Sequence, residues 1–218
     1  MTSARPLRAA IVDLDGTLVD TVGDFVVALS STLAEIGRPG VDADFVRRTV
    51  GKGSAYLVRA ALARAAADPG AFDAALARYQ HHYRAINGLH ASVYPGVVEG
   101  LDRFAARGLK LACLTNKPYA FALELLRRKD LARHFEHVFG GDSFARGKPD
   151  PLPVALTCAA LGAEPAATLV IGDSINDVQA ARGAGCPVVL VSYGYNHGAP
   201  AADAGADAVV DRLDAVLC

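Results

Sequence analysis

Six short runs of almost continuous apolar residues constrain the fold of this chain most. The runs are AAIVDLDG (9–16), LKLACLTN (109–116), HVFGG (137–141), TLVIGD (168–173), PVVLVSYG (187–194) and DAVVD (207–211). Such runs are typical of parallel strands that are covered on both faces, because half-exposed strands alternate apolar and polar residues. Helix-like segments accompany the runs, at 96–107, 118–129, 151–162, 176–184 and 212–217. The alternation predicts an α/β fold with a doubly wound, Rossmann-like parallel sheet.

The segment between the first two runs is far longer than a crossover helix requires. Apolar residues recur there at helical spacing from Phe25 to Ile36, and LVRAALARAAA and FDAALARYQHHY continue the pattern. We therefore expect an inserted, all-helical cap domain. The predicted division gives a core domain of residues 1–19 and 92–218 and a cap domain of residues 20–91.

Composition narrows the classes of partner. The 218 residues carry a net charge of -1, which gives no reason to expect a nucleic-acid or anionic-membrane partner. No apolar run approaches the roughly 18 residues of a membrane span, and Asp13 interrupts the first run too early for a secretory signal. The four cysteines form no CxxC pair, which indicates free thiols in a cytoplasmic protein. Oligomeric state is left open as a monomer or small homo-oligomer.

Chemically active side chains lie at the ends of three of the apolar runs, shortly after one of them, or between two runs. They are Asp13 and Asp15, Thr115 and Asn116, Lys148, and Asp173 and Asp177. In an open parallel sheet the functional crevice lies beyond the carboxyl ends of the strands, so these groups should converge. Several carboxylates in one crevice repel each other unless a cation lies among them. Mg²⁺ is the expected cation, and because it takes few carboxylates and prefers phosphate oxygens, a phosphorylated substrate is implied as well.

These residue types suit phosphoester hydrolysis. Asp13 can act as a nucleophile that forms an aspartyl phosphate, and Asp15 can protonate the leaving oxygen and then deprotonate a water. Thr115 and Lys148 can donate to phosphate oxygens. Free backbone N–H groups at Gly16 and at the turn after Thr115 should act in the same direction, and Gly16 should permit close approach of the backbone to the phosphate.

The segments DLDGTLVDT, LTNKP, GKPDP and VIGDSINDVQAARGAG resemble, in order and spacing, the four motifs of the haloacid dehalogenase-like hydrolases. The resemblance implies a cap that closes over the site and Mg²⁺ as cofactor. By matching position, it implies Asp13 as nucleophile, Asp15 as acid/base, and Thr115, Lys148 and the Asn116 backbone as phosphate ligands. The implied metal ligands are Asp13, the backbone carbonyl of Asp15, and Asp173, with Asp177 supporting the metal shell or Lys148.

Finer details, including VGKGSAYLVRAAL, YPGV and VSYGYNHG, resemble the phosphoglycolate phosphatases of that family. The expected substrate is therefore 2-phosphoglycolate, with Lys52 of the cap pairing with its carboxylate; the alternative for Lys52 is a solvated lysine in a flexible turn. Asp20 is expected to cap the first cap helix, and His197 to lie at the surface.

Other activities of the family remain open. They are hydrolysis of pyrophosphate or sugar phosphates, and a mutase reaction that returns the phosphoryl group to a sugar. Dehalogenases and phosphonate-cleaving relatives tend to lack the second acid, so Asp15 argues against both. A non-enzymatic binding protein should show damaged motifs, and here all four are intact.

Overall fold

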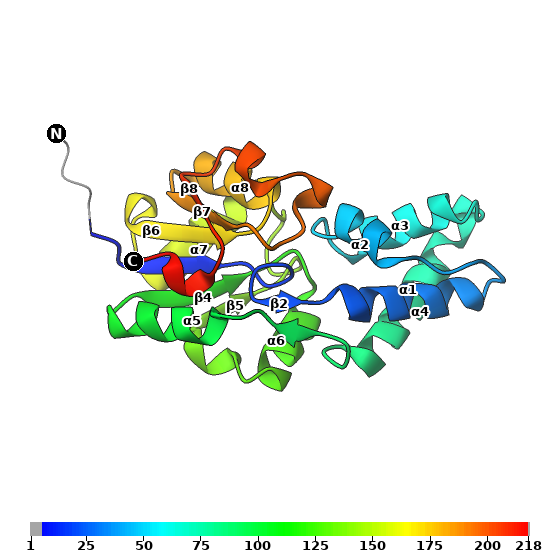
Figure 1. Cartoon of the computed structure of the whole chain (residues 1–218). Helices are drawn as coiled ribbons and strands as arrows, with labels where there is room; N and C mark the ends of the chain where they lie inside the picture. Colours follow the sequence, from blue (N-terminus) through cyan, green and yellow to red (C-terminus); the bar gives the residue numbers. More distant parts are fainter. Residues whose placement is uncertain (1–5, 218) are drawn as a thin grey trace.

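The computed structural model describes residues 6–217, and it shows a parallel sheet domain with a helical cap beyond one end of the sheet (Figure 1). The strand order is β5-β4-β1-β6-β7-β8, and each neighbouring pair is parallel. The strands are β1 Ala9–Val12, β4 Lys110–Leu114, β5 His137–Phe139, β6 Thr168–Gly172, β7 Val188–Val191 and β8 Ala208–Val210. All six lie within the predicted apolar runs, so the α/β fold class is confirmed.

Helices cover both faces of this sheet, which explains why its strands are apolar throughout. In β1, Ala10 and Val12 belong to one buried cluster, whereas Ala9 and Ile11 belong to the cluster on the opposite face. The first face is covered by α5 Val97–Ala106 and α6 Tyr119–Arg128, and the second by α7 Leu152–Leu161 and α8 Ile175–Ala184.

The predicted helix at 212–217 is wrong. The structure has only a 3-10 turn at Leu213–Ala215, although Leu213, Val216 and Leu217 pack against the core cluster at the helical spacing that suggested a helix. The 3-10 turns are η1 Pro69–Ala71, η2 Ala132–His134, η3 Pro165–Ala167, η4 Asn196–Gly198, η5 Ala201–Ala204 and η6 Leu213–Ala215.

The inserted segment folds as helices with a hydrophobic cluster of their own. The helices are α1 Val22–Ala34, α2 Ala43–Thr49, α3 Ser54–Arg64 and α4 Phe72–Ile86. Helices α1 and α4 pack together through residues such as Leu29, and the rings of Phe25 and Tyr83 stack with centroids 5.3 Å apart. The same cluster includes Phe121 and Tyr195 of the core domain, so the cap packs against the core.

A two-stranded ribbon connects the two domains. Strand β2, Val19–Asp20, pairs antiparallel with β3, Ser92–Val93, and this ribbon lies across the predicted domain division. Strands of two residues carry no readable periodicity, which is why the sequence gives no sign of them. The N-cap residue of α1 is Thr21 and not Asp20 as expected, although the Asp20 carboxylate accepts a hydrogen bond from the Val22 N–H at 3.1 Å.

Two further expectations concern burial and membranes. Cys113, Cys158 and Cys186 are buried free thiols, and Cys218 lies outside the described residues. Within residues 6–217 no helix has the length and apolar character needed to cross a bilayer.

Candidate active site

A cavity lies where the carboxyl ends of the central strands face the cap. Its volume is about 560 Å³, including the part that is open to solvent. Most of the predicted site residues line it: Asp13, Asp15, Thr115, Asn116, Lys148, Asp173 and Asp177. The cap contributes Phe25, Val50, Gly51, Gly53, Ser54 and Leu57, and the loop after β7 contributes Tyr195, Asn196 and His197. Because both domains supply walls, the cap is in contact with the core in this structure.

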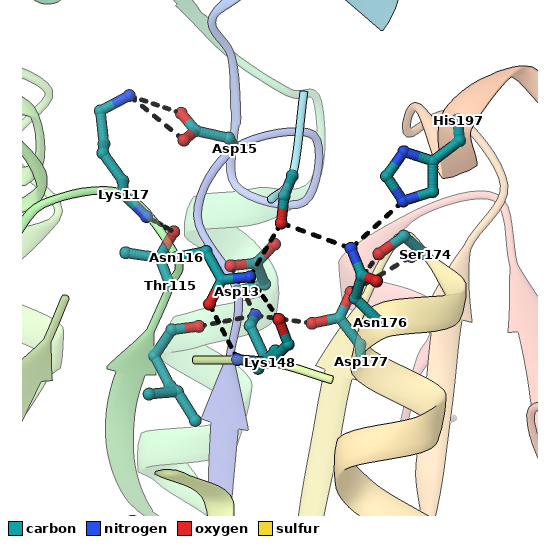
Figure 2. A network of polar contacts seen from close by, with 12 residues as sticks. Asp13, Asp15, Thr115, Asn116, Lys117, Lys148, Ser174, Asn176, Asp177 and His197 are labelled. Atoms are coloured by element: carbon teal, nitrogen blue, oxygen red, sulfur yellow. Dashed lines mark hydrogen bonds and ion pairs between the residues drawn. The ribbon is translucent and has the colours of Figure 1, made fainter. Parts of the chain in front are cut away.

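Lys148 joins the two carboxylates at the base of the cavity (Figure 2). Its Nζ lies 2.8 Å from Asp13 Oδ1 and 2.6 Å from Asp177 Oδ1, and it donates a third bond of 2.9 Å to the Leu114 carbonyl. Burial alone would lower the pKa of Lys148, but Asp13 and Asp177 outweigh burial and raise it. The ammonium is therefore charged; it donates hydrogen bonds to Asp177 and Leu114, and its contact with Asp13 is an ion pair.

Three carboxylates in this region are arranged as a candidate metal site. Asp13, Asp173 and Asp177 each offer an oxygen within 4.8 Å of the others. Burial, and to a lesser extent the charge of Asp177, raises the pKa of Asp13 to about 6, although Lys148 acts in the opposite direction. Burial and the same neighbouring carboxylates raise the pKa of Asp173. One ammonium does not balance three buried carboxylates, so a divalent cation with oxygen ligands fits this donor set.

Backbone and side-chain hydrogen bonds hold the metal-site carboxylates. Asp177 Oδ2 accepts from the Ser174 N–H at 3.2 Å and from the Ser174 hydroxyl at 2.9 Å, in the first turn of α8. Asp173 Oδ2 accepts from the Tyr195 N–H at 2.6 Å. The Tyr195 hydroxyl in turn donates to Asp20 at 2.9 Å and accepts from the Thr21 N–H at 2.8 Å. The metal site and the interdomain ribbon are thus connected through Tyr195.

Asp15 lines the same cavity but has different partners from Asp13. Its carboxylate pairs with Lys117 Nζ at 2.9 and 3.2 Å and accepts from the Thr21 hydroxyl at 2.8 Å (Figure 2). Sequence reasoning placed Lys117 within a motif but gave it no role. The signal was available, because an ionisable side chain directly follows Thr115 and Asn116 at the carboxyl end of a buried strand.

Asn116, predicted as a phosphate ligand through its backbone, also makes hydrogen bonds through its side-chain amide. Its Oδ1 accepts from the Lys148 N–H at 2.9 Å, and its Nδ2 donates to the Lys148 carbonyl at 2.7 Å. Nδ2 also donates to the Gly51 carbonyl of the cap at 2.9 Å. Neighbouring Thr115 is buried, and its hydroxyl accepts from the Lys117 N–H at 3.2 Å. Asn116 therefore fixes the backbone of Lys148 and also holds the cap.

The expectation of a free N–H at Gly16 is wrong. This N–H donates to the Val19 carbonyl at 2.9 Å, because the turn after β1 closes on itself. Gly16 has φ +87°, and a Cβ there would lie 2.4 Å from Asp173 Oδ2. Its structural contribution is to let Asp173 approach the turn, and it is not among the residues that line the cavity.

The cap loop is held by Asn176 as well as by Asn116. Asn176 Nδ2 lies 3.3 Å from the Gly51 carbonyl and 3.1 Å from His197 Nε2. His197 is half-buried at the cavity and not simply a surface residue, because the loop after β7 folds against α2. Burial, together with the charge of Lys52, lowers the pKa of His197.

Lys52 lies outside the residues that line the cavity. It is exposed, and its Nζ lies 5.1 Å from the centre of the Tyr56 ring. Its contact with a substrate carboxylate stays a prediction.

Comparisons with known proteins agree with the motifs. The model of the family described as haloacid dehalogenase-like hydrolase matches residues 7–185. A phosphoglycolate phosphatase of Thiobacillus denitrificans is 44% identical over 211 residues, covering 95% of this chain and 93% of that protein. A plasmid phosphoglycolate phosphatase of Cupriavidus necator is 44% identical, covering 99% of this chain and 94% of that protein.

A solved structure shows the same architecture. The crystal structure of a predicted phosphoglycolate phosphatase from Haemophilus somnus superposes with a TM-score of 0.93. The two chains are 30% identical, and the match covers 97% of this chain and 96% of the other.

Proposed function

Because the chain belongs to the haloacid dehalogenase-like hydrolases, we propose that it is a Mg²⁺-dependent phosphomonoesterase that converts 2-phosphoglycolate to glycolate and phosphate. The observation that carries the proposal is the position of Asp13, 2.8 Å from the Lys148 ammonium and within the cluster of Asp173 and Asp177. The names of the relatives at 44% identity support this substrate.

Asp13 is the proposed nucleophile. Its carboxylate oxygen attacks phosphorus, the bond from phosphorus to the ester oxygen breaks, and an aspartyl phosphate forms. Asp15, in its protonated form, gives a proton to the departing oxygen; as a carboxylate it then takes a proton from the water that attacks the aspartyl phosphate, which releases phosphate, restores Asp13 and reprotonates Asp15. In this structure the Asp15 carboxylate is bonded to Lys117 and Thr21, and we propose that it leaves Lys117 when it acts on the ester.

Two donors at the base of the cavity suit the phosphoryl oxygens. Lys148 is held by Asp177 and by the Asn116 amide, and the Thr115 hydroxyl retains its own proton for donation. Asp13 and Asp173, together with the Asp15 carbonyl, would hold Mg²⁺, and Asp177 would support Lys148. When bound, Mg²⁺ would neutralise charge on the phosphoryl oxygens.

The cap contacts favour a small substrate. With the Gly51 carbonyl bonded to Asn116 and Asn176, the cavity is closed over by the loop between α2 and α3. A substrate with few atoms beyond the phosphate suits a site that this loop covers, and the covering loop would exclude water from the reacting atoms.

The test is phosphate release from purified protein with 2-phosphoglycolate, pyrophosphate and sugar phosphates, in MgCl₂ and in EDTA. We expect 2-phosphoglycolate to give the highest kcat/KM and EDTA to abolish release. A sugar phosphate that is isomerised without phosphate release would replace the proposal with a mutase. Phosphate release that persists in EDTA would show that the reaction does not depend on Mg²⁺.

A further inference from the structure

Lys117 is enclosed at the boundary between the core and the cap. Its side chain is only 2% exposed, and Nζ lies 4.5 Å from the Phe25 ring centre and 4.7 Å from that of Tyr83. Both rings belong to cap helices, whereas the ion-pair partner Asp15 belongs to the core. A buried ammonium between aromatic faces is stabilised there but still requires an anion.

Lys117 and Lys148 are the two ammonium groups among the described residues that line the cavity, and only one of them can change partner. Lys148 is bonded to Asp13, Asp177 and the Leu114 carbonyl. Lys117 directs its charge to Asp15 alone among the carboxylates.

The proposed reaction separates Asp15 from Lys117. When Asp15 takes up a proton and turns toward the ester oxygen, the enclosed ammonium loses its anionic partner and both contacts of 2.9 and 3.2 Å. An unpaired charge in this position is strongly unfavourable, and the two aromatic rings replace the anion only in part. A second anionic group on the substrate would restore the ion pair.

We propose that Lys117 binds the carboxylate of the substrate in exchange for Asp15, and that this exchange selects phosphoesters with a second anionic group over neutral ones. The inference rests on the proposed function, since it concerns the same cavity and reaction. It makes Lys117 a specificity-determining residue.

The position of Lys117 relative to the phosphate donors supports this assignment. Lys117 and Thr115 both line the cavity, and the backbone N–H of Lys117 donates to the Thr115 hydroxyl at 3.2 Å. In 2-phosphoglycolate a single carbon separates the carboxylate from the ester oxygen, which matches two binding groups on neighbouring residues. Lys52, by contrast, is exposed and outside the cavity lining.

The test compares 2-phosphoglycolate with 2-hydroxyethyl phosphate, in which a neutral CH₂OH replaces the carboxylate. We expect the wild type to prefer 2-phosphoglycolate, and Lys117→Met to lower kcat/KM for it by about 100-fold, mainly through KM. The same variant should change kcat/KM for the neutral ester by less than about 10-fold. Lys117→Arg should restore part of the preference, because it returns the positive charge.

The matched control is Lys110→Met. Lys110 is an exposed lysine outside the cavity whose Nζ donates to the Leu161 carbonyl at 3.0 Å, so its removal should leave the ratio of the two kcat/KM values unchanged. Thermal unfolding of each variant shows whether it is folded. If Lys117→Met does not fold, the wild-type ratio still decides, because a ratio near one overturns the inference.

Several results contradict the inference and spare the proposed function. If Lys117→Met lowers kcat/KM equally for both esters, Lys117 only positions Asp15. If Lys52→Met changes the ratio and Lys117→Met does not, the carboxylate is bound by the cap loop.

A different result would contradict the proposed function itself. If the wild type hydrolyses neither ester in MgCl₂, both the proposed function and the inference are wrong.

Discussion

The two ion-paired lysines of the cavity differ in what holds them. All charged partners of Lys148 belong to the sheet domain, and its backbone is fixed by the Asn116 amide. Lys117 has one partner in the core, Asp15, and two in the cap, the rings of Phe25 and Tyr83. The first arrangement can persist whatever the cap does, whereas the second exists only while the cap is closed. The molecule thus separates a fixed group for phosphoryl chemistry from a group whose surroundings depend on cap position.

The largest expected effect on activity comes from a substitution among the partners of Lys148 in the sheet domain. Asp13→Asn removes the proposed nucleophile and should lower kcat by roughly four orders of magnitude or more, because the covalent route is lost. The free energy of unfolding should not fall, since a buried carboxylate that repels Asp177 and Asp173 is replaced by a neutral amide. Steady-state phosphate release and thermal unfolding measure the two quantities. Retention of more than about one per cent of the activity would remove Asp13 from the nucleophile role.

The second prediction concerns the cation. Mg²⁺ at about 100 times its dissociation constant should raise the free energy of unfolding by about 2.7 kcal/mol, because it binds only the folded carboxylate cluster. Thermal or urea unfolding in MgCl₂, with NaCl at matched ionic strength as control, measures the shift. Asp173→Asn should reduce it. An equal shift in NaCl, or an undiminished shift in Asp173→Asn, would contradict a specific site.

Asn116→Ala tests the residue that is bonded both to the Lys148 backbone and to the cap loop. It removes two bonds to the Lys148 backbone and one to the Gly51 carbonyl, so kcat/KM should fall by about 10- to 30-fold, or about 1.4 to 2 kcal/mol. Both kcat and KM should change, because the variant loosens a phosphate ligand and the cap together. A change in KM alone would mean that Lys148 keeps its position without Asn116.

Asn176→Ala tests the cap contact alone and should give the smallest effect. It loses the 3.3 Å bond to Gly51 and the contact with His197, while Lys148 keeps its bonds. KM should rise about threefold, or about 0.7 kcal/mol, with kcat within twofold of wild type. A larger fall in kcat than in Asn116→Ala would reverse the ranking of the two asparagines.

The sequence predicts the sheet domain and the residues at its carboxyl edge well, for a physical reason. Parallel strands covered on both faces must be apolar, and their carboxyl ends must meet, so the convergence of Asp13, Asp173 and Lys148 follows from the runs themselves. The cap could be predicted from helical periodicity, although the two-residue strands of the ribbon could not. Periodicity describes which face is buried and says little about segments of two or three residues.

The cap boundary could not be predicted in the same way. The surroundings of Lys117 depend on helices that are distant in sequence, and the half-buried position of His197 depends on how the loop after β7 packs on α2. Gly16 was assigned a free N–H because the closing bond to Val19 has no sequence signature. Contacts between domains arise from tertiary packing, and local patterns do not encode them.

The hydrogen bonds of Tyr195 have a consequence for motion. Its peptide N–H donates to Asp173, while its phenol is bonded to Asp20 of the interdomain ribbon and to Thr21, which follows the ribbon. A movement of the cap about this ribbon would therefore reach Asp173 through the Tyr195 side chain. We expect that opening of the cap would also weaken the hold of Asp173 on the proposed cation.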